Sequence, residues 1–191
     1  MGVDRDGRIH FMRITPETGK LLREFWPVVE KALPAILDDF YTFGASVPAL
    51  AKLIGSQSSR LKGAQAKHWA KLFDGRFDDE YVNSVRTIGL THNRIGLEPR
   101  WYIGGYSMIV ESIVRAVVEK HLDGFLYRKK AKDLSLDITA VMKAAFIDMD
   151  YGISVYLEAL QEAREKSEAE RRTLADQQDH AMQSMESSLA R

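Results

Sequence analysis

The 191-residue sequence contains no cysteine. Disulfides, thiolate zinc sites, iron–sulfur clusters and cysteine nucleophiles are therefore excluded, and any metal must be held by His, Asp, Glu or Tyr. Long apolar runs are also lacking, because charged residues break those around Ile109-Val110 and Val117-Val118, and the N-terminus has no apolar signal core. Neither sign of charge is in excess, with 27 basic and 27 acidic residues, so nothing favours nucleic acid or an anionic membrane surface. We expect a cytoplasmic protein that binds no nucleic acid and does not insert into a membrane.

Proline is scarce, at five residues, and no stretch alternates apolar and polar residues over the length of a strand. Apolar residues instead recur at i, i+3, i+4 and i+7 along most of the chain, which predicts an all-α protein. A hydrophobic content of 45% in a chain of this length is enough for one globular core. We expect a flexible N-terminus at residues 1–14, one domain at 15–160 and a helical connector at 161–191.

Helix boundaries are marked by caps, glycines and prolines. Thr15-Pro16-Glu17-Thr18 predicts a helix start, and Pro34 begins or kinks the following helix. Further helices are expected at 48–54, 60–73, 77–95 and 101–121, and a long one from Asp133, after an exposed basic loop at 127–132. The residues expected to face inward on this last helix are Ile138, Val141, Met142, Ala145, Phe146, Met149, Ile153, Tyr156 and Leu160.

The stretch from Thr87 to Tyr106 contains the most informative pattern. His92 falls on an apolar stripe whose members, Tyr81, Val85, Ile88, His92 and Ile95, step four and three residues along one helix. Gly96 then ends that helix and Pro99 opens the next, which predicts a tight corner directly after the histidine.

A histidine on an apolar helix face is more often a core residue than a metal ligand. No acid or second histidine lies one turn from His92, so a zinc motif of the HExxH kind is absent. A single imidazole suits heme iron, because the porphyrin supplies the other four ligands. Tyr102, returned by the corner, could hold the other ring nitrogen of His92. Tyr41 could donate a hydrogen bond from the opposite side, although a tyrosine in this position is, taken alone, more often a core residue.

An ordered motif surrounds His92. It runs His68-Trp69, Leu72-Phe73-x-Gly75, Tyr81, Ile88-Gly89, His92-x-Arg94-Ile95-Gly96-Leu97-x-Pro99 and Trp101-Tyr102-Ile103-Gly104-Gly105-Tyr106. In this motif the sequence resembles the globin-coupled sensors and related protoglobins. The resemblance implies a globin fold with an extra N-terminal helix and an extended C-terminal helix. It also implies heme b between two helices, His92 as the proximal iron ligand, and a distal tyrosine in the Phe40-Tyr41 pair.

The resemblance further implies that the last two globin helices pair with a second subunit, giving a homodimer. In such sensors the final helix enters an output domain, such as a chemotaxis signalling domain, a diguanylate cyclase or a kinase. We therefore expect residues 15–160 to be a sensor domain for a diatomic gas, foremost O2 and also CO or NO, that regulates chemotaxis or aerotaxis. The chain itself is then not an enzyme, since an output enzyme would follow residue 191.

The alternative within the same fold is a heme-free scaffold that binds other signalling proteins. His68 shares an inward stripe with Leu61 and Gln65; it either lines the pocket edge or ligates iron from the distal side. The candidate cofactor-binding residues are His92, Tyr41, Tyr102, Trp101, Phe40, Leu61, Gln65 and His68, with His92 as the metal ligand.

Overall fold

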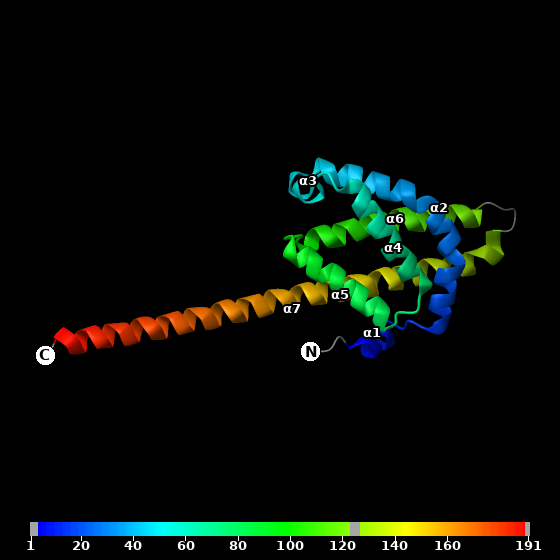
Figure 1. Cartoon of the computed structure of the whole chain (residues 1–191). Coiled ribbons are helices and arrows are strands. Elements are labelled where there is room, and N and C mark those ends of the chain that lie inside the picture. The colour runs from blue at the N-terminus through cyan, green and yellow to red at the C-terminus, as the bar shows by residue number, and fades with distance from the viewer. Residues whose placement is uncertain (1–3, 123–126, 190–191) are drawn as a thin grey trace.

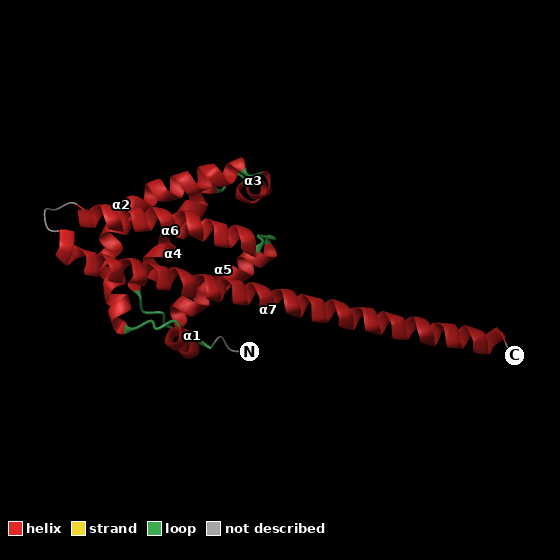
Figure 2. Cartoon of the chain, turned by 180° about the vertical axis from the view of Figure 1, so that it is seen from behind, coloured by secondary structure: helices red, strands yellow, loops and turns green. Residues whose placement is uncertain are grey.

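The computed structural model describes residues 4–122 and 127–189 of the chain. These residues form α-helices and no strand, which confirms the predicted all-α class (Figure 2). The helices are α1 (Arg5–Phe11), α2 (Pro16–Ser46), α3 (Pro48–Ile54), α4 (Ser58–Asp74), α5 (Asp79–Arg94), α6 (Pro99–Leu122) and α7 (Tyr127–Leu189).

Helix α2 begins where the sequence predicts and continues further than expected. Thr15 and Thr18 form a reciprocal capping box, in which each side-chain oxygen accepts from the other residue's backbone N–H. Pro34 does not open a new helix, because α2 continues to Ser46 with Pro27 and Pro34 inside it. Figure 1 shows α2 bent between its blue and cyan halves. Prolines inside a helix remove hydrogen bonds and clash with the preceding turn, which accounts for the bend.

The core lies where α2, α4, α5 and α6 surround the first half of α7. Helix α4 packs on α2, whereas α5 and α6 both pack on α7. Helices α4 and α5 therefore pack on different helices and not mainly on each other. Gly75 ends α4 in the left-handed conformation, with φ of +66°, and Asp78 caps α5 through the backbone N–H of Tyr81. The largest fully buried side chains are Trp69, Tyr81, Tyr151 and Phe73.

The inward face of α7 matches the prediction at Val141 and Ala145, which are buried, and differs from it at other positions. Met142 and Phe146, expected inside, are 42% and 52% exposed, whereas the small Ala144 and the acid Asp148 are buried. Small residues face inward because the helices approach closely: a Cβ added to Gly89 of α5 would lie 3.0 Å from the carbonyl oxygen of Gly152. The prediction placed the bulkiest residues inside, and bulk is a poor guide at such a crossing.

Two segments at the ends of the predicted domain also differ. In place of a flexible N-terminus, residues 5–11 form α1, whose Arg8 pairs with Asp150 of α7 and lies 3.1 Å from the Ser154 hydroxyl. The backbone from Tyr127 to Lys132, predicted as a loop, is the first part of α7. Helix α7 therefore begins earlier than expected, and α1 is tied to its middle.

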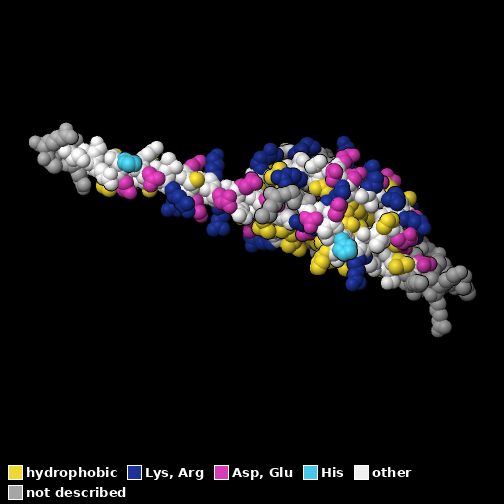
Figure 3. Space-filling model, turned by 90° about the horizontal axis from the view of Figure 1, so that it is seen from below, with side chains coloured by type: hydrophobic (Ala, Val, Ile, Leu, Met, Phe, Trp, Pro, Cys, Tyr) yellow, Lys and Arg dark blue, Asp and Glu magenta, His cyan; other side chains and the backbone are white. Residues whose placement is uncertain are grey.

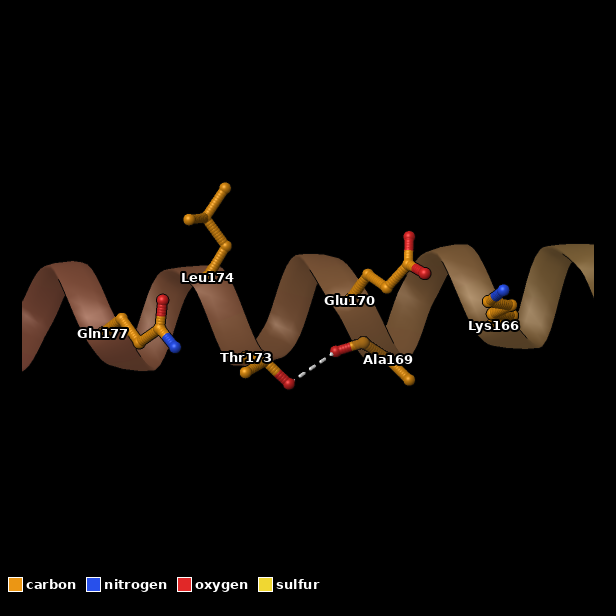
Figure 4. A pocket seen from close by; sticks show the side chains of 6 residues that line it. All are labelled: Lys166, Ala169, Glu170, Thr173, Leu174 and Gln177. Atoms are coloured by element: carbon orange, nitrogen blue, oxygen red, sulfur yellow. Dashed lines mark hydrogen bonds between the residues drawn. The ribbon is translucent and has the colours of Figure 1, made fainter.

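Beyond residue 160, α7 projects away from the globular part (Figure 1), and every side chain described there is exposed. Figure 3 shows acidic and basic side chains interspersed along this projection, whereas hydrophobic side chains gather on the globular part. Figure 4 shows side chains from Lys166 to Gln177 on this single helix, where the Thr173 hydroxyl donates to the Ala169 carbonyl at 3.0 Å. All the side chains that line this surface belong to α7, so within the described part of the chain it is not a cleft. None of the described helices is long and apolar enough to cross a bilayer.

Candidate functional site

His92 lies near the C-terminal end of α5, where the apolar stripe emerges from the core. Tyr81 and Val85 at the start of the stripe are buried, His92 is half-buried and Ile95 is 42% exposed. Burial, together with the positive charge of His68, lowers the pKa of His92 to about 4. Neither ring nitrogen of His92 forms a hydrogen bond within the described residues. The imidazole is therefore neutral near pH 7, with a lone pair available to a metal.

The predicted corner follows His92 directly. Gly96 adopts φ of +71°, and the backbone N–H of Leu97 donates to the His92 carbonyl at 2.9 Å. Helix α6 then begins at Pro99 and brings the Tyr102 ring to the His92 ring, with centroids 5.1 Å apart and planes at 63°. The contact is between rings, because the Tyr102 hydroxyl donates to the Tyr106 hydroxyl at 3.4 Å instead of to His92. Tyr102 thus limits the orientation of the imidazole by packing.

Tyr41 and its neighbours form a second group, from α2 and α4. Tyr41 is 7% exposed, and its ring packs edge-on against Phe40 at a centroid distance of 5.0 Å. Burial raises the pKa of Tyr41, and its hydrogen bond with Gln65 acts in the opposite direction. Gln65 also accepts from the Trp69 ring N–H at 3.1 Å. The phenol therefore keeps its proton at neutral pH and lies beside the α4 stripe that includes half-buried Leu61.

His68 pairs with a residue that the sequence analysis missed. Its Nε2 atom lies 2.8 Å from Oδ2 of Asp148, a fully buried carboxylate on α7. Burial alone lowers the pKa of His68, but the charge and hydrogen bond of Asp148 outweigh it and raise that pKa above its usual value. Because Nε2 is bound to Asp148, the buried Nδ1 is the nitrogen left without a partner within the described residues.

Tyr81 and Tyr106 complete this group, since both hydroxyls donate to Asp148. A signal for Asp148 was present in the sequence. Val141, Ala145, Asp148 and Gly152 step four, three and four residues along one face, so an acid stands among small apolar residues. An ionisable group in such a stripe must find hydrogen-bond donors when it is buried.

Trp101 is the predicted site residue that lies apart from these groups. It is half-buried, with the Arg100 guanidinium 5.1 Å from its ring centroid, and it contacts no other aromatic ring within the described residues. Its neighbour Tyr102 is the aromatic residue that reaches His92.

The donor set fits one kind of metal group. Within the described residues, no three His, Asp or Glu side chains gather as a metal held by protein alone requires. One neutral imidazole is present instead, in half-buried apolar surroundings, with a protonated phenol on another helix. The buried, unpartnered Nδ1 of His68 adds a polar atom able to meet a polar group. This set suits a planar apolar group whose metal takes one axial ligand from the protein.

The arrangement of helices is that of a globin. The structure matches the globin domain of a Geobacter sulfurreducens globin-coupled sensor with a TM-score of 0.70 and 22% identity, over 79% of this chain and 96% of that chain. A family model described as Protoglobin matches residues 4–162. The chain belongs to the protoglobin family, which confirms the resemblance found in the sequence.

One curated relative is the "Heme-based aerotactic transducer HemAT" of Halobacterium salinarum. It is 28% identical over 115 residues, which cover 59% of this chain. The match spans 24% of the transducer, so the chain corresponds to about a quarter of that protein's length.

Proposed function

We propose that this chain is a heme-based gas sensor domain in which His92 is the proximal ligand of heme b. The observation that carries the proposal is the state of His92, whose neutral ring has both nitrogens without a partner among the described residues and lies beside the corner that leads into α6. Its place in a protoglobin chain supports the same assignment. Bound heme supplies an iron that takes up a diatomic gas reversibly.

The side chains around the proposed heme site have different roles. Tyr102 restrains the His92 ring by contact, and Phe40 and Leu61 contribute apolar surface that excludes water. Tyr41 keeps its proton and can donate a hydrogen bond to a polar gas. A donor of this kind favours O2 over the less polar CO, so O2 is the proposed ligand.

Optical spectroscopy of the heme-loaded chain tests this function. We expect the reduced protein to change its absorption spectrum on exposure to O2 and to CO, and to recover when the gas is removed. An absorption spectrum that changes with neither gas would contradict the sensor role. An unchanged melting temperature with and without heme would then favour the heme-free scaffold.

Replacing Tyr41 with Phe tests the distal assignment. Loss of one hydrogen bond costs about 1 kcal/mol or more in a dry pocket, so O2 dissociation should accelerate about fivefold or more. Stopped-flow or flash-photolysis measurements would give the rate. Tyr151→Phe, on the part of α7 that packs against Arg8 of α1, removes a phenol hydroxyl away from Tyr41 and should leave the rate unchanged. Equal rates in Tyr41→Phe and wild type would mean that Tyr41 is a core residue and does not donate a hydrogen bond to the bound gas.

We also infer a homodimer through α6 and α7. Met142, Phe146, Leu157 and Leu160 lie on one face of α7 and are between 42% and 53% exposed. An apolar stripe of this length on a surface helix is typical of a helix–helix interface. The all-round apolar character of α6 supports a shared bundle, as does Ile103, which is 48% exposed.

Phe146→Glu tests this interface. A charge placed in the apolar stripe should shift the protein from dimer to monomer in sedimentation or light scattering, because an unpaired buried charge is strongly unfavourable. Phe43→Glu is the matched control, since Phe43 is 57% exposed on α2, away from the stripe. Dimers that persist in Phe146→Glu, or that dissociate equally in Phe43→Glu, would contradict the assignment.

The proposed output is chemotaxis or aerotaxis signalling. It is supported by the function in the name of the Halobacterium salinarum relative and by the continuous α7, which leaves the globular part without a break. On this view the connector at 161–189 carries the signal away from the heme site.

A further inference from the structure

Asp148 is the point at which four helices meet through polar side chains. The residue belongs to α7 and is fully buried. Its carboxylate accepts from the Tyr81 hydroxyl of α5 and the Tyr106 hydroxyl of α6, and it lies 2.8 Å from His68 Nε2 of α4. One side chain of the projecting helix is thus bound to every helix that carries a part of the site except α2.

A buried carboxylate holds its partners firmly. Its charge is tolerated away from water only while donors surround it, and hydrogen bonds to an ionised group are shorter and stronger than neutral ones. Each of the three partners is itself mostly buried, so none of them can exchange Asp148 for bulk water without local opening. The positions of Tyr81, Tyr106 and His68 are therefore fixed relative to α7.

A continuous series of contacts joins His92 to this carboxylate. The His92 ring packs on Tyr102, the Tyr102 hydroxyl donates to Tyr106 at 3.4 Å, and the Tyr106 hydroxyl donates to Asp148. In this series the two side chains between the proposed iron ligand and Asp148 both belong to α6. A shift of His92 that displaces Tyr102 would therefore alter the hydrogen bond that the Tyr106 hydroxyl accepts from Tyr102.

We propose that Asp148 is a positioning residue that couples the heme site to α7 by holding Tyr106, and that the Tyr102–Tyr106–Asp148 series carries the ligand state of the site into the projecting helix. The inference rests on the proposed heme-sensing function and assigns the side chain of α7 through which that function acts. Coupling of this kind requires the bound ligand to favour one arrangement of the series over another.

A second contact between Tyr102 and α7 offers a competing route. A Cβ added to Gly152 would lie 2.7 Å from the Tyr102 hydroxyl, so Tyr102 also packs directly on the α7 backbone. This route does not include Tyr106 or Asp148. The two routes therefore differ in which substitutions interrupt them.

The experiment compares variants that make equal changes to the Asp148 carboxylate. Tyr106→Phe and Tyr81→Phe each remove one phenol hydroxyl from it, but only Tyr106 stands between Tyr102 and Asp148. Asp148→Asn keeps the shape and removes the charge. Asp150 lies on the same helix as Asp148 and pairs with Arg8 of α1. Asp150→Asn is therefore the control for a lost carboxylate.

Hydrogen–deuterium exchange of the heme-loaded full chain, reduced and measured with and without CO, gives the readout. In wild type we expect CO to change exchange rates in α7 around residues 149–156 by about fivefold or more. Tyr106→Phe and Asp148→Asn should abolish this CO-dependent change, whereas Tyr81→Phe and Asp150→Asn should retain it. Loss of stability alone would affect Tyr81→Phe as much as Tyr106→Phe, so the difference between these two variants reports coupling.

Each other outcome is decisive. A CO-dependent change that survives in Tyr106→Phe overturns the inference and assigns the coupling to the Gly152 contact. Wild type that binds CO without any exchange change in α7 overturns it as well, while leaving the heme site intact. Failure of the proposed function itself is recognised separately, by the absence of a heme absorption band in wild type. If Asp148→Asn does not fold, the two phenol variants decide the matter.

Discussion

His92→Ala should abolish stable heme binding. The imidazole is the only side chain proposed to hold the iron, and Ala leaves an apolar gap with no donor. Changes to residues that merely orient a metal ligand cost about 10–100-fold in affinity, so loss of the ligand itself should exceed about 100-fold. Heme retained after gel filtration, read from the absorption band and the iron content, gives the measurement.

Two controls make this result specific. His180→Ala removes an exposed histidine of the connector and should retain heme as wild type does. Imidazole added to His92→Ala should restore part of the absorption band, since a free ligand can enter the gap. A variant that keeps full heme content without imidazole would show that the iron is held elsewhere, and His68 would be the next residue to test.

Asp148→Ala should strongly destabilise the folded protein. It leaves the Tyr81 and Tyr106 hydroxyls and His68 Nε2 buried without an acceptor. Removing one partner of a buried charged network costs about 3–5 kcal/mol. Urea unfolding of the heme-free protein, compared with wild type at the same pH, gives the loss.

Asp150→Ala is the comparison for this measurement. Asp150 pairs with Arg8 at the surface, where the two side chains are 34% and 25% exposed. Partly exposed ion pairs of this kind contribute about 1 kcal/mol or less. Similar losses for the two variants would mean that the Asp148 network is no stronger than a surface ion pair, and the account of its role would fail.

Local sequence signals predicted the helix boundaries around the site. Thr15 caps α2, and Gly96 and Pro99 form the corner after His92, all as expected. These signals succeed because a cap, a positive φ or a missing N–H depends on a few neighbouring residues. The proximity of Tyr102 to His92 followed from that corner.

Features that depend on packing between distant segments were not predicted. The inward face of α7 was assigned to large residues such as Phe146, because side-chain volume cannot reveal how closely α5 and α6 approach. Asp148 was missed for the same reason, since its partners lie 42 to 80 residues away in the chain. The contact between α1 and Asp150 also joins segments that are far apart in the chain. The local sequence therefore did not reveal it and indicated a flexible terminus instead.

The proposed function requires residues 15–160 to form one specific heme site centred on His92. Titration of the heme-free wild-type chain with hemin, followed in the Soret region, tests for that site. We expect absorbance to rise steeply and to saturate at one heme per chain, with a further shift when the reduced protein meets CO. A gradual rise without saturation, equal to that of a protein with no heme site, would contradict the account.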